Sequence, residues 1–427
     1  MDRSLIWLWL SLHFGAGSTV YSKLYSYFGD EYEIYNCDDN DVRPIEWLND
    51  SQKRKLLDKN LDHAHEIMDW CIDNDVEIIA YSDDKYPYSL KTIKNFPAVL
   101  YCLGDMPDFN EELSIAVVGT RTMTNYGQKA AFNLSFGLAK GGAIIVSGMA
   151  IGIDGTAAMG AINALGRTVA VLGSGIDVIY PKQNAHLMRR IMEYGAVITE
   201  YAPGTPPNSI NFPIRNRIIS GLSQATVVVE ADENSGAMIT AKLALEQKRK
   251  LFSVPGPIGA FHSTGTNRLI REGAEIAMSA LDILEYFLDK YPDKINISGA
   301  KTRPIFKRES LKVAAGHDKD KFYESYKKKL KETKKQSRKM IRSFKEVSED
   351  ENESLKIQDQ IKEQEFDASC LSDEEKKIYD LMEKGKPVTE DDFISHGFSI
   401  ADIASAFTML EIAGAIEKRP GGFFVKK

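Results

Sequence analysis

Residues 114–119 read SIAVVG, and a similar pattern returns at 143–148 as AIIVSG and at 168–173 as TVAVLG. In each case a short apolar run rich in β-branched residues ends in a glycine. Such runs are typical of strands buried on both faces of a parallel sheet. Longer helical patterns, among them Gly127–Lys140 and Ala185–Tyr194, alternate with the runs. The alternation predicts an α/β fold with an extended, Rossmann-like, doubly wound sheet.

The sheet domain is predicted to occupy residues 81–290, because three more apolar runs follow at Ala196–Thr199, Thr226–Glu230 and Leu251–Val254. Residues 1–80 differ in pattern: aromatic and aliphatic residues recur there at helical spacing, and Gly15-Ala-Gly17 interrupts the first helix. We therefore expect a small helical domain before the sheet domain.

Composition restricts the possible functions. The chain has 427 residues, 43% of them hydrophobic, which excludes a wholly disordered chain. With 54 basic against 61 acidic residues, its formal net charge is −7. The protein as a whole is therefore not a basic nucleic-acid binder, and DNA binding would require a local positive patch.

No membrane span or redox framework is expected. The apolar stretch Leu5–Phe14 is too short to cross a bilayer and lacks the basic flank of a signal peptide, which favours a buried helix. The four cysteines, at positions 37, 71, 102 and 370, are far apart and form no metal-binding pattern. A reducing, cytoplasmic location fits this usage.

Residues 300–366 form a charged linker or insertion. The segment is basic from Lys301 to Lys345 and acidic from Glu346 to Phe366, with few apolar residues. Two interpretations remain open. The segment is either a solvated tether whose halves neutralise each other, or a basic arm that contacts nucleic acid.

The tail, residues 370–427, has the pattern of a winged helix. Ser372 is placed to cap a helix that runs to Glu383, and Thr389–Ser395 and Ser399–Ala413 are two further helices. The runs Ala415–Lys418 and Phe423–Lys426, on either side of Pro420-Gly-Gly422, predict a hairpin. Three helices and a hairpin in so few residues are typical of a winged helix-turn-helix.

Glycine-bearing turns follow the first three predicted strands. In a doubly wound sheet these turns meet at the carboxyl edge, where backbone N–H groups and helix N-termini can bind phosphate. Four cations, Arg121, Lys182, Arg215 and Arg217, are predicted to lie in loops or at element starts near these turns. Together they favour a site for phosphate oxygens.

Enzymatic chemistry is not indicated. The sequence has neither a complete GxGxxG fingerprint nor a GxxxxGK[ST] loop, and no histidine falls in a glycine turn beside a nucleophile. Asp154 and Asp177 are expected to cap a helix or brace a loop instead of acting as an acid–base pair. No cofactor and no metal are expected.

The block Phe212–Ser223, FPIRNRIISGLS, resembles the most characteristic block of the DNA-processing protein A (DprA, or Smf) family. Further blocks match in order, from Gly119-Thr-Arg121 through Gly173-Ser-Gly-Ile-Asp177 to Val254-Pro-Gly256. The resemblance is strong over residues 80–285. Residues 1–80 weakly resemble the family's helical domain, and the tail resembles its winged-helix module.

That resemblance implies a cytoplasmic, homodimeric protein that binds single-stranded DNA, protects incoming DNA in natural transformation and helps load a RecA-type recombinase, with no catalytic turnover. It also implies a DNA-binding role for Arg121 and Lys182 as cations of the pocket. The remaining implied contacts are backbone and hydroxyl donors: Gly119, Thr120, Ser147, Gly148, Gly173, Ser174 and Gly175.

The sequence departs from the family pattern in places. Ala158-Met159 stand where members often carry His-Arg, so one contact is lost. The third tail helix, Ser399–Ala413, carries acidic residues and no Lys or Arg, which favours a protein partner or a structural role over DNA reading. The alternative functions are a phosphoribohydrolase-like, nucleotide-processing enzyme, whose PGGxGT-type block is absent, and a nucleotide sensor.

Overall fold

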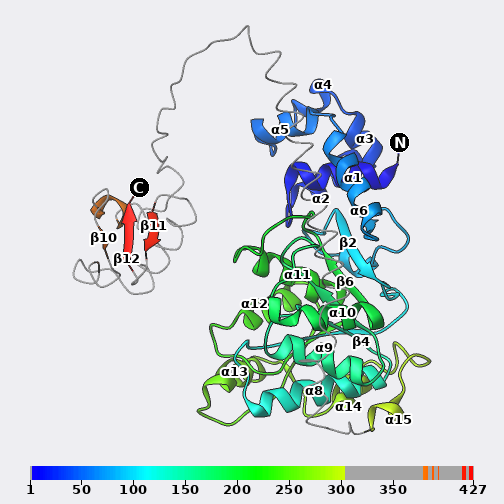
Figure 1. The fold of residues 1–427 in the computed structure, drawn as a ribbon, viewed down its shortest axis with the longest axis vertical. Coiled ribbons are helices and arrows are strands. Elements are labelled where there is room, and N and C mark those ends of the chain that lie inside the picture. Colours follow the sequence, from blue (N-terminus) through cyan, green and yellow to red (C-terminus); the bar gives the residue numbers. More distant parts are fainter. Residues whose placement is uncertain are drawn as a thin grey trace. The chain divides into compact units, whose positions relative to one another are not determined.

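The structure is a computed structural model that describes residues 2–302, 378–382, 387–388, 393, 416–419 and 423–426. The chain divides into two units, residues 1–319 and 320–427, which are described separately (Figure 1). Within the described residues, no helix combines the length and the apolar character needed to cross a membrane.

The amino-terminal part of the first unit is helical. Helix α1 begins after Asp2, whose side chain accepts the backbone N–H of Ser4, and it ends at Gly15, where φ is +76°. Glycine adopts this conformation at low cost, so the predicted interruption is confirmed. Residues 5–10 are buried, which confirms the predicted buried helix. The helices are α1 (Arg3–Phe14), α2 (Val20–Phe28), α3 (Glu31–Asn36), α4 (Asp39–Val42), α5 (Asp50–Leu57) and α6 (Asp62–Asp73).

One sheet of nine strands forms the rest of the unit, in the order β1-β2-β6-β5-β4-β3-β7-β8-β9. Neighbouring strands from β6 to β9 are parallel, which confirms the doubly wound, Rossmann-type sheet. The strands are β1 (Glu77–Ala80), β2 (Val99–Gly104), β3 (Ser114–Val118), β4 (Ile144–Ser147), β5 (Thr168–Val171), β6 (Gly195–Thr199), β7 (Ala225–Val228), β8 (Lys250–Ser253) and β9 (Glu275–Ile276).

Helices cover both faces of this sheet. Ile115 and Val117 of β3 pack with side chains of α8 and α14, whereas Ala116 and Val118 belong to the core that includes α11 and α12. Alternate residues of a strand point to opposite faces, so α8 and α11 lie on opposite sides. The helices are α7 (Tyr88–Lys91), α8 (Asn125–Lys140), α9 (Ile153–Asn163), η1 (Lys182–Asn184), α10 (Ala185–Tyr194), α11 (Asn211–Leu222), α12 (Gly236–Glu246), η2 (Phe261–Ser263), α13 (Thr264–Arg271), α14 (Ala280–Tyr286) and α15 (Ile297–Ala300).

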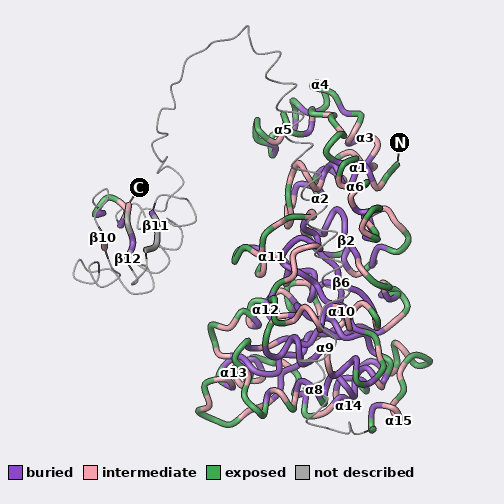
Figure 2. Tube along the Cα trace, in the orientation of Figure 1, coloured by how far each residue is buried: buried purple, intermediate pink, exposed green. Residues whose placement is uncertain are grey.

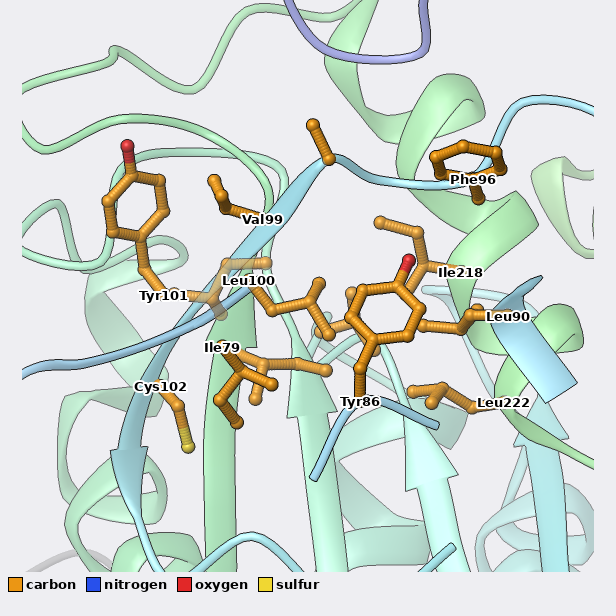
Figure 3. Packing of buried hydrophobic residues seen from close by; sticks show 14 of the residues in the cluster. Ile79, Tyr86, Leu90, Phe96, Val99, Leu100, Tyr101, Cys102, Ile218 and Leu222 are labelled. Carbon is orange, nitrogen blue, oxygen red and sulfur yellow. The ribbon is translucent and has the colours of Figure 1, made fainter. Parts of the chain in front are cut away.

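The sheet extends further towards the helical part than predicted. β2 is antiparallel to both β6 and β1, and β1 consists of residues 77–80, which the sequence placed in the helical domain. Buried residues of β1 and β2, among them Ile79 and Leu100, pack in one cluster with Ile218 and Leu222 of α11 (Figure 3). The buried core is therefore continuous from α1 through the sheet (Figure 2).

The described part of the second unit contains a small antiparallel sheet of β10 (Pro387–Val388), β12 (Phe423–Lys426) and β11 (Ile416–Arg419), in that order. It also contains helical residues 378–381, within the helix predicted to end at Glu383. β11 and β12 pair as the predicted hairpin. The predicted helices Thr389–Ser395 and Ser399–Ala413 lie almost wholly outside the described residues, as does the charged segment from residue 303 onward. The winged helix therefore stays a prediction.

Candidate nucleic-acid interface

A cavity of about 520 Å³ lies where the strand order reverses. The chain proceeds outward from β3 to β6 and then returns to β7 on the other side of β3, which opens a crevice at the carboxyl edge. The cavity is lined by the turns after β3 and β4, the segment from Pro207 into α11, and the first residues of α12, with Tyr180 at its side. The predicted location of the site is thus a cavity in the structure.

Arg121 and Phe212 lie together at this cavity. Arg121 is exposed, and its guanidinium is 5.5 Å from the centre of the Phe212 ring. The centres of the Tyr180 and Phe212 rings are 5.4 Å apart. Arg121 forms no ion pair with another described residue, although its positive charge acts on the buried carboxylate of Asp154 in the same cavity. A free cation beside aromatic rings suits a phosphate and its attached base.

Lys182 lies next to the cavity lining instead of in it. It begins η1, is exposed, and has no ion-pair partner in the described part of the chain. Asn184, at the other end of η1, donates from Nδ2 to the carbonyls of Met149 (2.9 Å) and Ala150 (3.2 Å). The Lys182 segment is therefore fastened to the turn after β4, and its cation borders the same edge.

Arg215 does not lie in a loop as predicted; it belongs to α11 and is 4% exposed. Its guanidinium donates to the carbonyls of Gly148 (3.0 Å) and Val171, and is 5.8 Å from the centre of the Phe212 ring. Burial lowers its pKa to about 10, although the negative charge of Asp154 opposes this shift. Arg215 is thus a buried residue of the cavity lining, and its positive charge adds to the electrostatic potential there.

The prediction for Arg217 also fails. This residue is in α11, not in a loop, and its buried guanidinium donates twice to Glu200, at 2.7 Å to each carboxylate oxygen. Its Nε donates to the carbonyl of Asn95 at 2.8 Å, and Glu200 accepts the backbone N–H of Gly17 at 3.1 Å. Arg217 therefore joins the helical part to the sheet and does not line the cavity.

Several predicted phosphate donors in the turns after β3, β4 and β5 already form hydrogen bonds to other atoms of the protein. The hydroxyls of Ser147 and Ser174 donate to the carbonyls of Val117 and Val178. The backbone N–H groups of the other affected residues are also bonded internally: Thr120 to Glu230 O, Gly148 to Asp154 Oδ2, and Gly175 to Thr205 O.

Close packing explains two of the turn glycines. A Cβ at Gly173 would lie 2.8 Å from Phe212 Cδ1, and one at Gly148 would lie 2.7 Å from Arg215 Nη2. Both turns must therefore lack side chains for α11 to approach the sheet edge. Gly119 meets a similar limit, because its Cβ would lie 2.6 Å from Ile153 Cγ1.

Both aspartates brace loops, as predicted. Asp154 Oδ2 accepts the Gly148 N–H at 3.2 Å, and Asp177 Oδ1 accepts the Gly204 N–H at 2.7 Å. Burial raises the pKa of Asp154, while the positive charge of Arg215 opposes the shift. Among the residues described, no group of histidines, cysteines and carboxylates could hold a metal ion.

Sequence reasoning missed the aromatic part of the site. Phe212 is the first residue of the block FPIRNRIISGLS, which was used as evidence of family resemblance, and Phe212 itself was not predicted to contact a ligand. Its position two residues after the loop, in the first turn of α11, places the ring between Arg121 and Arg215. The start of α12 adds the positive end of a helix dipole to the lining. The arrangement suits binding of a phosphate beside a planar ring.

The model of one family, described as DNA recombination-mediator protein A, matches residues 77–288. The DNA processing protein DprA of Bacillus subtilis is 41% identical over 210 residues, which make up 49% of this chain and 71% of that protein. This chain belongs to the DNA recombination-mediator protein A family.

The fold of a solved structure agrees with this membership. The X-ray structure of DprA from Streptococcus pneumoniae shares 31% identity and a TM-score of 0.56, covering 67% of this chain and 98% of that chain. A structure of DNA processing protein A from Helicobacter pylori, described for its single-stranded-DNA-binding mode, has 31% identity and a TM-score of 0.46, covering 50% and 97%. The resemblance inferred from the sequence is confirmed, and the family match covers the sheet that forms the cavity.

Proposed function

We propose that this recombination-mediator family member binds single-stranded DNA at the crevice between β3 and β7, protecting it during natural transformation and recombination. The observation that carries the proposal is the exposed guanidinium of Arg121, which lies beside the Phe212 ring and has no ion-pair partner among the described residues. A single strand can present a phosphate and an unstacked base together, whereas a duplex keeps its bases paired. Lys182 extends the contact along the backbone.

We propose the remaining features with the support of family membership. The protein acts in the cytoplasm as a homodimer, without a cofactor or catalytic turnover, and passes its DNA to a RecA-type recombinase. We further propose that its parts are a helical part that ends before β1, the sheet domain from β1 to residue 290, a charged linker or insertion (300–366) and a winged helix (370–427).

The test is a comparison of strand types by fluorescence anisotropy. The full chain is titrated against labelled oligo(dT) and against a duplex of the same length, together with Arg121→Ala and Arg121→Lys. We expect preference for the single strand, and a loss of about ten- to a hundredfold in affinity for Arg121→Ala, as for a charge-assisted bond to phosphate. The log–log salt slope should fall by roughly 0.7 in Arg121→Ala and stay unchanged in Arg121→Lys.

A matched control removes another exposed cation far from the crevice, Lys290, by substitution to Gln. Equal effects of Arg121→Ala and Lys290→Gln would contradict the assignment of the crevice. Turnover of nucleoside monophosphates by the wild-type chain would favour the nucleotide-processing alternative instead.

A further inference from the structure

A second groove lies in the helical part of the first unit, away from the crevice. It has a volume of about 700 Å³ and lies between α2, the segment after α4, and the segments that follow β1 and α7. The charged residues that line it are all basic, whereas the chain as a whole is acidic. Three of its residues are lysines, Lys23, Lys91 and Lys94, and none is Asp or Glu, although the protein carries a net charge of −7.

The three lysines are available to an anion. Lys23 and Lys94 are exposed and Lys91 is partly buried, and none of them forms an ion pair with any residue that the structure describes. Two of them instead lie over aromatic rings: Lys23 Nζ is 5.3 Å from the centre of the Trp47 ring, and Lys91 Nζ is 5.0 Å from that of Tyr81. Their charge is therefore held at the groove and remains uncompensated.

Aromatic rings form the apolar part of the same groove. Tyr81 stacks on Phe96 with ring centres 4.2 Å apart, and Tyr25 is 5.2 Å from Tyr81, which makes a rigid inner surface. At the rim, Tyr27 and Trp47 are 54% and 37% exposed. Large aromatic side chains left this exposed at a groove usually serve a binding partner.

The groove and the crevice belong to one unit and are joined through a short stretch of chain. Lys94 and Phe96 flank Asn95, whose carbonyl accepts the Arg217 Nε–H of α11. The same helix holds Phe212 and Arg215 at the crevice. The two sites are therefore held by one framework.

We infer that this groove is a second binding site for single-stranded DNA, in which bases stack on Trp47 and Tyr27 while Lys23 and Lys94 bind phosphates. Interleaved cations and exposed rings are what an unpaired polynucleotide requires, since every base offers a face for stacking. A lysine that already lies over a ring can meet the phosphate of a nucleotide whose base contacts that ring. The inference rests on the proposed function and extends the length of strand that one protein molecule contacts.

The experiment uses the full chain and oligo(dT) of about 30 nucleotides, long enough for more than one site. The double variant Lys23→Gln/Lys94→Gln is compared with Lys290→Gln/Lys294→Gln, which makes the same charge change near α14 and α15, at the opposite end of the described unit (Figure 1). We expect the groove variant to bind about tenfold more weakly at low salt, with a salt slope reduced by roughly 1.4 for two lost phosphate contacts. The control pair should leave the slope unchanged.

A second readout reports on stacking. Of the four tryptophans, Trp7 and Trp9 are fully buried, Trp70 is partly buried and does not line the groove, and Trp47 is exposed. Quenching of tryptophan fluorescence by oligo(dT) should therefore fall sharply in Trp47→Phe. Groove variants that match the control in affinity and slope, or quenching that persists in Trp47→Phe, would overturn the inference. Arg121→Ala is measured in parallel. If Arg121→Ala lowers the affinity for oligo(dT) and the groove variants do not, the proposed function stands and only the second site is excluded. A wild-type chain that binds no oligo(dT) overturns both.

Discussion

Breaking the ion pair between Arg217 and Glu200 should destabilise the first unit strongly. Their side chains are 2% and 1% exposed and share two bonds of 2.7 Å. In Arg217→Met the Glu200 carboxylate keeps the Gly17 N–H but loses its counter-charge in a water-excluded position. A buried charge left without its partner costs about 3–5 kcal/mol. This cost is a large fraction of the free energy of unfolding of a folded domain, which is typically ~5–15 kcal/mol.

The double variant Glu200→Gln/Arg217→Met shows whether the cost comes from an orphaned charge. We expect its loss in unfolding free energy to be smaller than the sum of the two single losses by about 2–3 kcal/mol, because neither charge remains. Urea unfolding followed by tryptophan fluorescence measures these values, and Trp7 and Trp9 report on the helical part. The matched control is Arg167→Met, which breaks the exposed pair with Glu112 and should cost no more than about 1 kcal/mol.

The same variant decides between the two roles considered for Arg217. As an internal connection it should leave the salt slope of DNA binding unchanged wherever the protein is folded. A stability loss below about 1 kcal/mol for Arg217→Met, together with a salt slope lower by roughly 0.7, would refute the structural role and restore the phosphate contact predicted from the sequence.

Three further outcomes are expected. Gly173→Ala should cost about 1–3 kcal/mol in urea unfolding and weaken oligo(dT) binding, because its Cβ displaces the Phe212 ring; wild-type affinity would show that the ring makes no contact. Cys71 and Cys102 should react with a thiol reagent at pH 8 only after unfolding, since burial raises the pKa of both to about 12; fast labelling of either residue in the native chain, located by peptide mapping, would contradict their burial. A chain that ends at Asp367 should bind oligo(dT) within about tenfold of the full chain in anisotropy, and a hundredfold loss would instead assign DNA contacts to the tail.

The sheet could be predicted because its information is local. Each buried parallel strand is a continuous apolar run that ends in a glycine turn, and β3 was predicted with the bounds that the structure has. β2 has an equally apolar sequence, VLYCL, but its antiparallel pairing depends on where β6 returns in space. No spacing in the sequence gives that information, so the edge of the sheet was missed.

The arginines of α11 show a different limit. The sequence placed Arg215 and Arg217 in loops or at element starts, but both lie inside a helix. Pro213 does not prevent this helix, because it lies in the first turn, where its missing N–H costs nothing. Whether an arginine on that helix meets solvent or a carboxylate depends on Glu200, 17 residues away along the chain. Charge type could be predicted from the sequence, whereas burial and pairing required the fold.

Helix α11 has little freedom to vary over its first two turns. Phe212 and Arg215 face the crevice, while Arg217 binds Glu200 and Ile214 lies against Gly17 of the helical part, where a Cβ would come within 2.6 Å of its Cγ2. A substitution in these two turns must keep both the crevice and the contacts with the helical part, and a change at a contact position is compatible with the fold only when its partner changes too. Position 214 should therefore covary with position 17, and position 217 with position 200, across homologues of this chain.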